Sequence, residues 1–232
     1  MLFRSQDGVT IYWNGNVNGT GESYVGEFFR RAPGFFDEVC YTGDGTLTRS
    51  ITHNLTVAPE LLIVKRRATG LDSWYVYAPS GNHRLLLNTD LASPCYNAPF
   101  SGTTPTATTF SYTSDDLNQS GFTFVAYLFA SCLGVSKVGS YTGTGATQTI
   151  DCGFTGGARF VLIKRTDSTG DWYVWDTARG MVSGTDPSLL LNSTAAEVNA
   201  NSVYTTGVGF QIVSTAAGIN ASGGSYIYLA VS

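Results

Sequence analysis

Positive charge is scarce in this chain. Its 232 residues include 13 lysines and arginines against 17 aspartates and glutamates, and the formal net charge is −4. Lysine occurs only as Lys65, Lys137 and Lys164, and the sequence contains no basic run. A protein that binds nucleic acid needs a concentrated positive face to replace the counterions of the phosphates. The composition therefore argues against nucleic acid as a partner.

Long apolar runs are also missing. The longest candidate, residues 121–135, is interrupted by Thr123 and Ser131. A helix that spans a bilayer needs about 18 or more predominantly apolar residues. We therefore expect no membrane insertion.

Cysteines are few and scattered. They form no C-x-x-C pair, and they stand at unmatched positions in the two halves of the chain: Cys40, Cys95, Cys132 and Cys152. This spacing argues against a disulfide framework and against a metal site. We expect free, mostly buried thiols and no bound metal.

Histidine is equally rare. His53 and His83 have no counterparts in the second half of the chain, where Cys152 stands in place of His53. A repeat that kept a catalytic site in both copies would match at such positions. We therefore predict a protein without catalytic residues or cofactors, and not an enzyme.

Glycine and aromatic residues are plentiful, with 27 glycines, 13 tyrosines and 13 phenylalanines. Apolar runs of about 4 to 8 residues, rich in β-branched and aromatic side chains and bounded by Gly, Asn, Ser or Asp, are typical of strands. We expect strands at 38–42, 48–53, 61–66, 74–78, 83–88, 108–113 and 122–129, and at 137–142, 147–152, 160–165, 172–176, 188–192, 209–213 and 226–231. Only residues 194–201 could form a helical turn. The predicted fold class is all-β.

The chain repeats itself with a period of about 100 residues. Residues 41–45 (YTGDG) return at 141–145 (YTGTG), and the segments 62–66, 73–77 and 85–89 return in the same order at 161–165, 171–175 and 189–193. The closing segment at 118–127 returns at 220–229, and a third copy of its start lies at 18–26, before residue 35. We predict a C-terminal hairpin of a preceding repeat at 1–34, followed by two tandem β-sandwich (jelly-roll-like) units at 35–133 (unit 1) and 134–232 (unit 2).

An N-x-S/T-G motif occurs in all three copies, at Asn18, Asn118 and Asn220. It resembles a glycosylation acceptor, but the same residues suit a tight turn before a strand. We interpret it as turn chemistry.

Two aromatic clusters are the candidate ligand-binding residues. They are Trp74, Tyr75 and Tyr77 in unit 1 and Trp172, Tyr173 and Trp175 in unit 2. Flat rings can stack on a sugar, yet aromatics that alternate along a strand must send one face into the core. Core packing is the favoured interpretation, and outward-facing members could contact a glycan. The pairs at 65–66 and 164–165 (Lys-Arg) are expected to end their strands in solvent.

Acidic residues offer the main enzymatic alternative. A glycosidase uses a pair of carboxylates, and the candidates near strand ends are Asp115, Asp116, Asp171 and Glu197. No pair among them stands out. Asp115 and Asp116 are better explained by a solvated turn.

The chain resembles a domain of tailed-bacteriophage virion proteins. The similarity rests on residues 35–45 (FFDEVCYTGDG), 53–55 (HNL), 58–60 (APE), 62–66 (LIVKR), Trp74 and 124–130 (FVAYLFA), and in unit 2 on 141–145, 161–172 and 226–229. Unit 2 departs from the pattern at 152–154, where HNL is replaced by CGF. The resemblance implies a tail fibre, tail spike or related appendage and assigns no catalytic residue.

These observations lead to one expected function. The protein is predicted to be a structural and adhesion component of a phage virion, assembled in the bacterial cytoplasm, whose loops contact the host surface. Expected partners are other virion proteins, further copies of the chain (a trimer, by the resemblance) and a bacterial surface glycan. A capsid decoration or head-fibre protein, a glycan-binding module and a polysaccharide depolymerase remain alternatives.

Overall fold

The computed structural model describes residues 18–67, 73–78, 85–92, 100 and 102–232. Its regular structure is almost entirely antiparallel β, which confirms the predicted all-β class. The strands of unit 1 are β1 (Phe36–Thr42), β2 (Arg49–Thr52), β3 (Leu61–Arg66), β4 (Tyr75–Tyr77), β5 (Leu85–Leu86), β6 (Thr109–Tyr112) and β7 (Thr123–Phe129), with the short 3-10 helix η1 (Asp115–Leu117). The elements of unit 2 are β8 (Ser136–Thr142), β9 (Gln148–Asp151), β10 (Phe160–Arg165), β11 (Trp172–Asp176), β12 (Asp186–Leu190), β13 (Val198–Ala200), β14 (Val203–Thr206), β15 (Gly209–Ile212), α1 (Ala217–Asn220) and β16 (Ser225–Val231).

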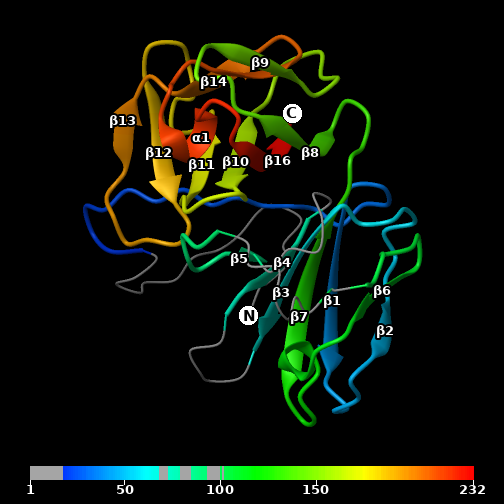
Figure 1. Cartoon of the computed structure of the whole chain (residues 1–232). Coiled ribbons are helices and arrows are strands. Elements are labelled where there is room, and N and C mark those ends of the chain that lie inside the picture. Colours follow the sequence, from blue (N-terminus) through cyan, green and yellow to red (C-terminus); the bar gives the residue numbers. More distant parts are fainter. Residues whose placement is uncertain (1–17, 68–72, 79–84, 93–99, 101) are drawn as a thin grey trace.

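Each unit contributes one large and one small sheet. The large sheet of unit 1 has the strand order β1-β7-β3-β4-β5, and that of unit 2 has the order β8-β16-β10-β11-β12-β13. The small sheets are β2-β6 and β9-β15-β14. Strands with matching sequences thus occupy matching places, and Figure 1 shows unit 2 above unit 1.

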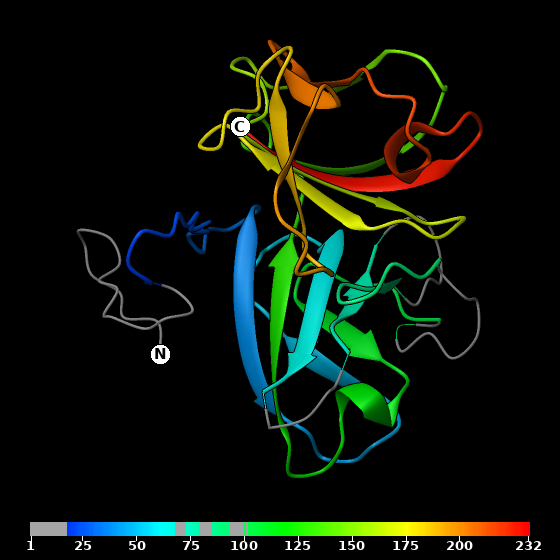
Figure 2. The same ribbon diagram turned by 90° about the vertical axis from the view of Figure 1, so that its left-hand side faces the viewer.

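The large sheets pack on both faces, which explains their continuous apolar runs. In β3, Leu62 and Val64 belong to a core that also contains Phe110 of β6. The alternate residues Leu61 and Ile63 belong to a second core, shared with β10 of unit 2. A third core lies between the two sheets of unit 2. The molecule is therefore layered, and the two large sheets face each other across the shared core (Figure 2).

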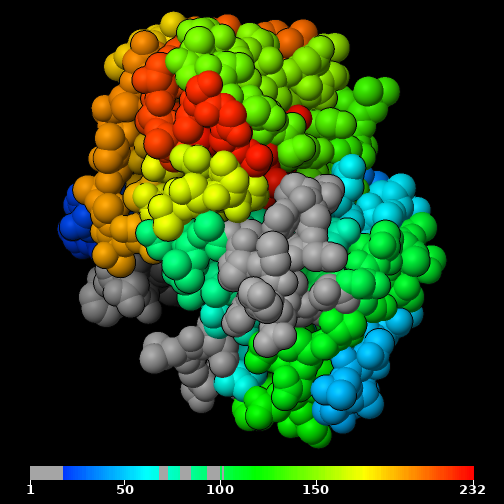
Figure 3. All heavy atoms as spheres, in the orientation of Figure 1, coloured from blue at the N-terminus to red at the C-terminus, as the bar shows by residue number. Residues whose placement is uncertain are grey.

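Hydrogen bonds also join the two units. The indole Nε1 of Trp172 donates to the carbonyl of Leu86 (2.9 Å), and the amide of Gly170 donates to the carbonyl of Asp90 (2.8 Å). Lys164 is completely buried, and its Nζ lies 3.2 Å from Asp90 O and 2.6 Å from Gly170 O. In Figure 3 the loop after β5 lies against the yellow atoms of this part of unit 2. The prediction that Lys164 ends its strand in solvent was wrong, because the loop of unit 1 covers it.

The strand predictions fail mainly near residues 194–201. No helical turn forms there; β13 pairs instead with β12 of the large sheet. Residues 198–200 carry no strand pattern because β13 is a fully exposed edge strand of only three residues. The strand β14 and the short helices η1 and α1 were not predicted either.

The N-terminal segment does not form the predicted hairpin in its described part. Residues 18–34 contain no strand, and residues 1–17 lie outside the described part of the chain. Phe29 anchors the segment, with its ring centre 5.3 Å from that of Phe129 and 5.7 Å from that of Phe160. The guanidinium of Arg31 binds the buried carboxylate of Asp37 at 2.6 Å. The segment thus touches both units where their shared core meets solvent.

Replacing Phe29 by alanine is expected to lower the free energy of unfolding by about 1.5 kcal/mol, because a half-buried ring that touches both units is removed. The neighbouring Phe28 is 65% exposed, so Phe28→Ala should change the stability by less than about 0.5 kcal/mol. Urea titration of both variants gives the comparison. Equal losses would show that the ring of Phe29 does not hold the units together.

The cysteines are only partly as predicted. Cys40, Cys132 and Cys152 are free thiols, but only Cys152 is buried, whereas Cys40 is exposed on β1. Cys95 lies outside the described residues. Within the described part of the chain, no helix is long and apolar enough to cross a membrane.

Candidate functional site

The most strongly repeated motif is structural. Asn220 is completely buried. Its Nδ2 donates to the carbonyls of Ala146 and Ser214, both at 2.8 Å, and its Oδ1 accepts from the amide of Thr144 (2.9 Å) and from Nε2 of Gln148 (2.7 Å). Four hydrogen bonds therefore hold the turn after β8 against the segment before β16.

Unit 1 repeats this arrangement. Asn118 is also completely buried, and its amide group bonds the turn at Asp44 and Thr46. A Cβ atom on Gly43 would lie 2.2 Å from the carbonyl oxygen of Gln119, so only glycine allows this approach. The interpretation of the motif as turn chemistry agrees with these contacts.

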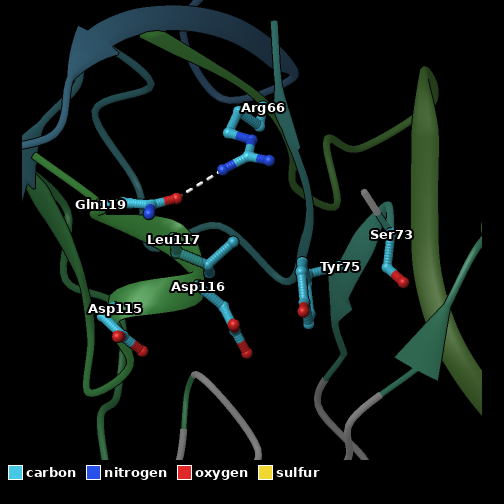
Figure 4. A pocket seen from close by; sticks show the side chains of 7 residues that line it. All are labelled: Arg66, Ser73, Tyr75, Asp115, Asp116, Leu117 and Gln119. Carbon is cyan, nitrogen blue, oxygen red and sulfur yellow. Dashed lines mark hydrogen bonds between the residues drawn. The ribbon is translucent and has the colours of Figure 1, made fainter. Parts of the chain in front are cut away.

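Beside the turn of unit 1 lies a polar pocket of about 300 Å³. Figure 4 shows its lining residues, which come from β3, β4, the segment before β4, η1 and the segment after η1: Arg66, Ser73, Tyr75, Asp115, Asp116, Leu117 and Gln119. The buried Tyr75 and Leu117 are its least exposed members, while both aspartates are exposed. We call these seven residues the η1 pocket.

Local sequence explains how η1 presents its carboxylates. The side chain of Ser114 accepts a hydrogen bond from the amide of Asp116 and so caps the helix. Asp115 and Asp116 occupy the first turn, where free amides favour negative charge. Arg66, at the end of β3, donates to Oε1 of Gln119 at 2.5 Å on the other side of the pocket (Figure 4).

Unit 2 is built differently at the same place. Counting from the two buried asparagines, Gly218 corresponds to Asp116, and the matching segments 73–77 and 171–175 pair Tyr75 with Tyr173. A Cβ atom on Gly218 would lie 2.5 Å from the hydroxyl of Tyr173, so α1 and the tyrosine are in close contact. The segment before the buried asparagine therefore packs directly on the tyrosine in unit 2, whereas in unit 1 it lines a pocket with two carboxylates.

The η1 pocket is suited to a hydroxyl-rich ligand. Carboxylates accept hydrogen bonds from hydroxyl groups, and a guanidinium and an amide donate to them. The pocket is open and mainly polar, so it is not suited to a large apolar ligand. Among the described residues, no group of three or more His, Cys, Asp or Glu side chains could hold a metal ion.

The other candidate carboxylates lie elsewhere. Asp171 accepts a hydrogen bond from Nδ2 of Asn192 at 2.7 Å, and Glu197 lies 3.4 Å from Nη1 of Arg179. Neither lines the η1 pocket. Of the four predicted acidic candidates, the structure brings only Asp115 and Asp116 into this pocket.

The aromatic candidates divide by burial. Trp172 and Trp175 are each 1% exposed and Tyr75 is 9% exposed, so these three offer no ring face to a ligand. Trp74, Tyr77 and Tyr173 are half-buried. The six residues form no shared stacking platform, because alternate members point into different cores. Tyr75 lines the η1 pocket.

A second pocket, of about 460 Å³, lies over the ends of β8 and β16. It is lined by Ser140, Tyr141, Thr142, Thr166, Asp167, Ser225 and Tyr226. Arg165 binds Asp167 beside it at 2.8 Å. Sequence reasoning missed this pocket, since its serines and threonines carry no motif.

His53 has a structural role. Its Nδ1 accepts a hydrogen bond from the amide of Leu55 and its Nε2 lies 3.2 Å from the carbonyl of Thr106, which assigns the proton to Nε2. The ring is buried. This agrees with a histidine whose ring nitrogens both have hydrogen-bond partners. His83 lies outside the described residues.

Acid is expected to destabilise the protein through His53. Burial lowers the pKa of this ring below 6.5, so as the pH falls the unfolded chain takes up the proton first and folding stability is lost. His53→Cys copies the residue of unit 2 and should reduce the drop in melting temperature between pH 7 and pH 5. An unchanged drop in the variant would assign the acid sensitivity to other groups.

A family model matches nearly the whole chain. The match covers residues 14–232, including most of the N-terminal segment together with both units, and the family is described as a domain of unknown function, DUF7483. No curated protein and no solved structure matches the chain. The two units and the segment that precedes them therefore belong to the DUF7483 family.

Proposed function

We propose that this chain is a structural and adhesion component of a bacteriophage virion, in a tail fibre or spike-like protein that contacts the host surface. Support comes from the resemblance of both units to tailed-phage virion domains. The layered β-structure and the low content of charged residues, 13%, suit a stiff appendage with hydrogen-bonding loops. The protein would be part of the phage particle and act with other virion proteins.

We further infer that the two units are tandem copies of one jelly-roll-like β-sandwich. The equivalent strand orders of the large sheets support this inference. So does the buried asparagine before the last strand of each unit. In this arrangement the units share a core, so unit 1 and unit 2 form one rigid body and not two domains joined by a flexible linker.

The observation that carries the adhesive role is the η1 pocket, which combines Arg66, Asp116 and Gln119 in unit 1. Its equivalent in unit 2 is occupied by the contact of Gly218 with Tyr173. Unit 2 folds without a pocket at this position, so the folding of unit 1 does not require one. We propose that the pocket binds a neutral saccharide of the bacterial surface and that the protein has no catalytic centre of its own.

Binding to bacterial polysaccharides tests this proposal. The purified chain is applied to an array of capsular polysaccharides and lipopolysaccharide glycans. Asp116→Asn should reduce binding at least about tenfold, as expected for the loss of a charged hydrogen-bond acceptor. Asp167→Asn, in the second pocket, is the matched control and should bind normally. Binding that depends on Asp167 and not on Asp116 would refute the assignment of the site.

Virion location needs a separate measurement. An antibody against the chain should label tail structures of purified phage particles in immunogold electron microscopy. Labelling over the head would instead indicate a decoration or head-fibre protein. A chain that is absent from purified particles would refute the virion role.

A depolymerase is the second candidate function, because two carboxylates lie in one pocket. It predicts clearing of polysaccharide by the purified chain and loss of clearing in Asp115→Asn or Asp116→Asn. Glu197→Gln is the control, since Glu197 lies outside the pocket.

A further inference from the structure

The N-terminal segment repeats the local structure that precedes the last strand of unit 2. The amide of Gly19 donates to the hydroxyl of Tyr24 at 2.9 Å, as the amide of Ala221 donates to the hydroxyl of Tyr226 at 2.8 Å. The spacing from Asn18 and from Asn220 is the same. The third copy of the motif has therefore kept its fold as well as its sequence.

The turn geometry agrees in all three copies. The hydrogen bond that closes the turn joins Glu22 N to Gly19 O (3.4 Å), with equivalents of 3.2 Å at residues 119–122 and 2.9 Å at residues 221–224. The glycine before the turn's last residue has a φ of 84° at Gly21, 80° at Gly121 and 78° at Gly223. Residues 19–22 thus form the same turn that precedes β7 in unit 1 and β16 in unit 2.

The exit from the segment also matches that of β7. Ala32 and Phe36 exchange backbone hydrogen bonds of 2.9 and 3.1 Å, and Cys132 and Ser136 exchange equivalent bonds of 3.0 and 2.9 Å. The segment between turn and exit is therefore the counterpart of β7 and β16, which each pair with a strand on both sides.

Despite this match, the segment forms no strand in the described structure. We call residues 22–28 the arm. Val25 is 41% exposed and Phe28 is 65% exposed. The family match begins at residue 14 and so includes the arm with the two units. A sequence of this kind, with strand character and exposed apolar side chains, is suited to pairing with another strand.

The long sheet edges of the molecule are poor partners for the arm. On β1, Asp37 bonds the amide of Glu38 and Arg49 bonds the carbonyl of Thr42. On β8, the hydroxyl of Ser131 bonds both the amide and the carbonyl of Val138. The edge strands β5 and β13 have only two and three residues. Side chains and short length thus blunt the edges of the two large sheets, and the edge strands of the small sheets, β2, β6, β9 and β14, have only four residues each.

We propose that the arm pairs as an antiparallel β-strand with the arm of a second copy of this chain, across a two-fold axis at Val25. In this register Tyr24 lies opposite Gly26, and Glu27 lies opposite Ser23, so no carboxylates face each other. A register shifted by one residue along one arm would set Glu22 against Glu27. The proposal does not depend on the virion role, and it replaces the trimer expected from the resemblance by a two-fold contact.

Cross-linking tests the register. Val25→Cys and Val57→Cys are made separately in a Cys40→Ser chain, because Cys40 is an exposed thiol. Val57 is 38% exposed and lies outside the arm, which makes it a matched control. Under mild oxidation, Val25→Cys should give a covalent dimer as the main product, whereas Val57→Cys should remain monomeric.

Light scattering on the full chain tests the assembly itself. The expected molar mass is twice the 24.7 kDa of one chain. Val25→Asp places two carboxylates opposite each other and should halve the mass, while Val57→Asp should not change it. The melting temperature of Val25→Asp should stay unchanged at low protein concentration, since the arm is exposed. A monomer at high concentration, a trimer, or a dimer that survives Val25→Asp would each overturn the proposal.

Discussion

Replacing Asn220 by alanine is expected to lower the free energy of unfolding by about 4 kcal/mol, a large part of the stability of an ordinary domain. The asparagine is completely buried and makes four hydrogen bonds. Its removal takes these partners from the amide of Thr144 and from the carbonyls of Ala146 and Ser214, and it leaves a hole where the completely buried side chain stood. Unsatisfied buried groups cost about 1 to 3 kcal/mol each, part of which relaxation recovers.

The same motif supplies the control. Asn18 occupies the equivalent position before the arm and is exposed, so Asn18→Ala should change the stability by less than about 0.5 kcal/mol. Urea unfolding followed by far-ultraviolet circular dichroism measures both variants. Similar losses for Asn18→Ala and Asn220→Ala would mean that the motif acts through local turn propensity and not through buried hydrogen bonds.

Lys164 is expected to make the protein more stable as the pH rises from 7 to 9.5, by about 2 kcal/mol. Burial lowers its pKa from 10.5 to about 8. Above pH 8 the folded protein therefore loses this proton while the unfolded chain still holds it, and the folded state gains relative stability as the pH rises. The energetic cost of burying the charge disappears in the same range.

Lys164→Met should lack this contribution. Burial raises the pKa values of Cys152 and Tyr228, to about 11 for Cys152, and these groups oppose the effect. They are present in wild type and variant alike, so the difference between the two proteins isolates Lys164. Lys65→Met, at the matching position of unit 1, is the control and should follow the wild type. Parallel pH profiles for wild type and Lys164→Met would show that Lys164 stays charged when buried.

Local patterns predicted much of the fold. The bounds of β3, β10 and β11 are those expected from their apolar runs, and the four apolar residues that begin β3 are all buried. These features depend on side-chain alternation and on turn glycines, and both are determined by residues that are adjacent in the sequence. The edge strand β13 was missed because pairing with β12, and not its own sequence, makes it a strand.

The candidate site could be predicted only in part. Asp115 and Asp116 were among the candidate carboxylates but were interpreted as part of a solvated turn, and nothing in the sequence placed Arg66 and Tyr75 beside them. Those residues lie 40 to 50 positions away in the sequence, and only the packing of η1 against β3 and β4 brings them together. The aromatic clusters show the opposite failure, since the chemistry of Trp172 suits a sugar but its burial between the units excludes one.

By itself the sequence determined the all-β class, the repeat, the places of most strands and the turn role of the N-x-S/T-G motif. Tertiary structure alone decided which faces the units share, which carboxylates line a pocket and which copy of the motif is buried. Lys65 and Lys164 show why. Their neighbours along the chain are nearly identical, yet only Lys164 is completely buried, because a loop some seventy residues away in the sequence covers it. Strand and turn formation are local, whereas burial depends on contacts between residues that are distant in the sequence.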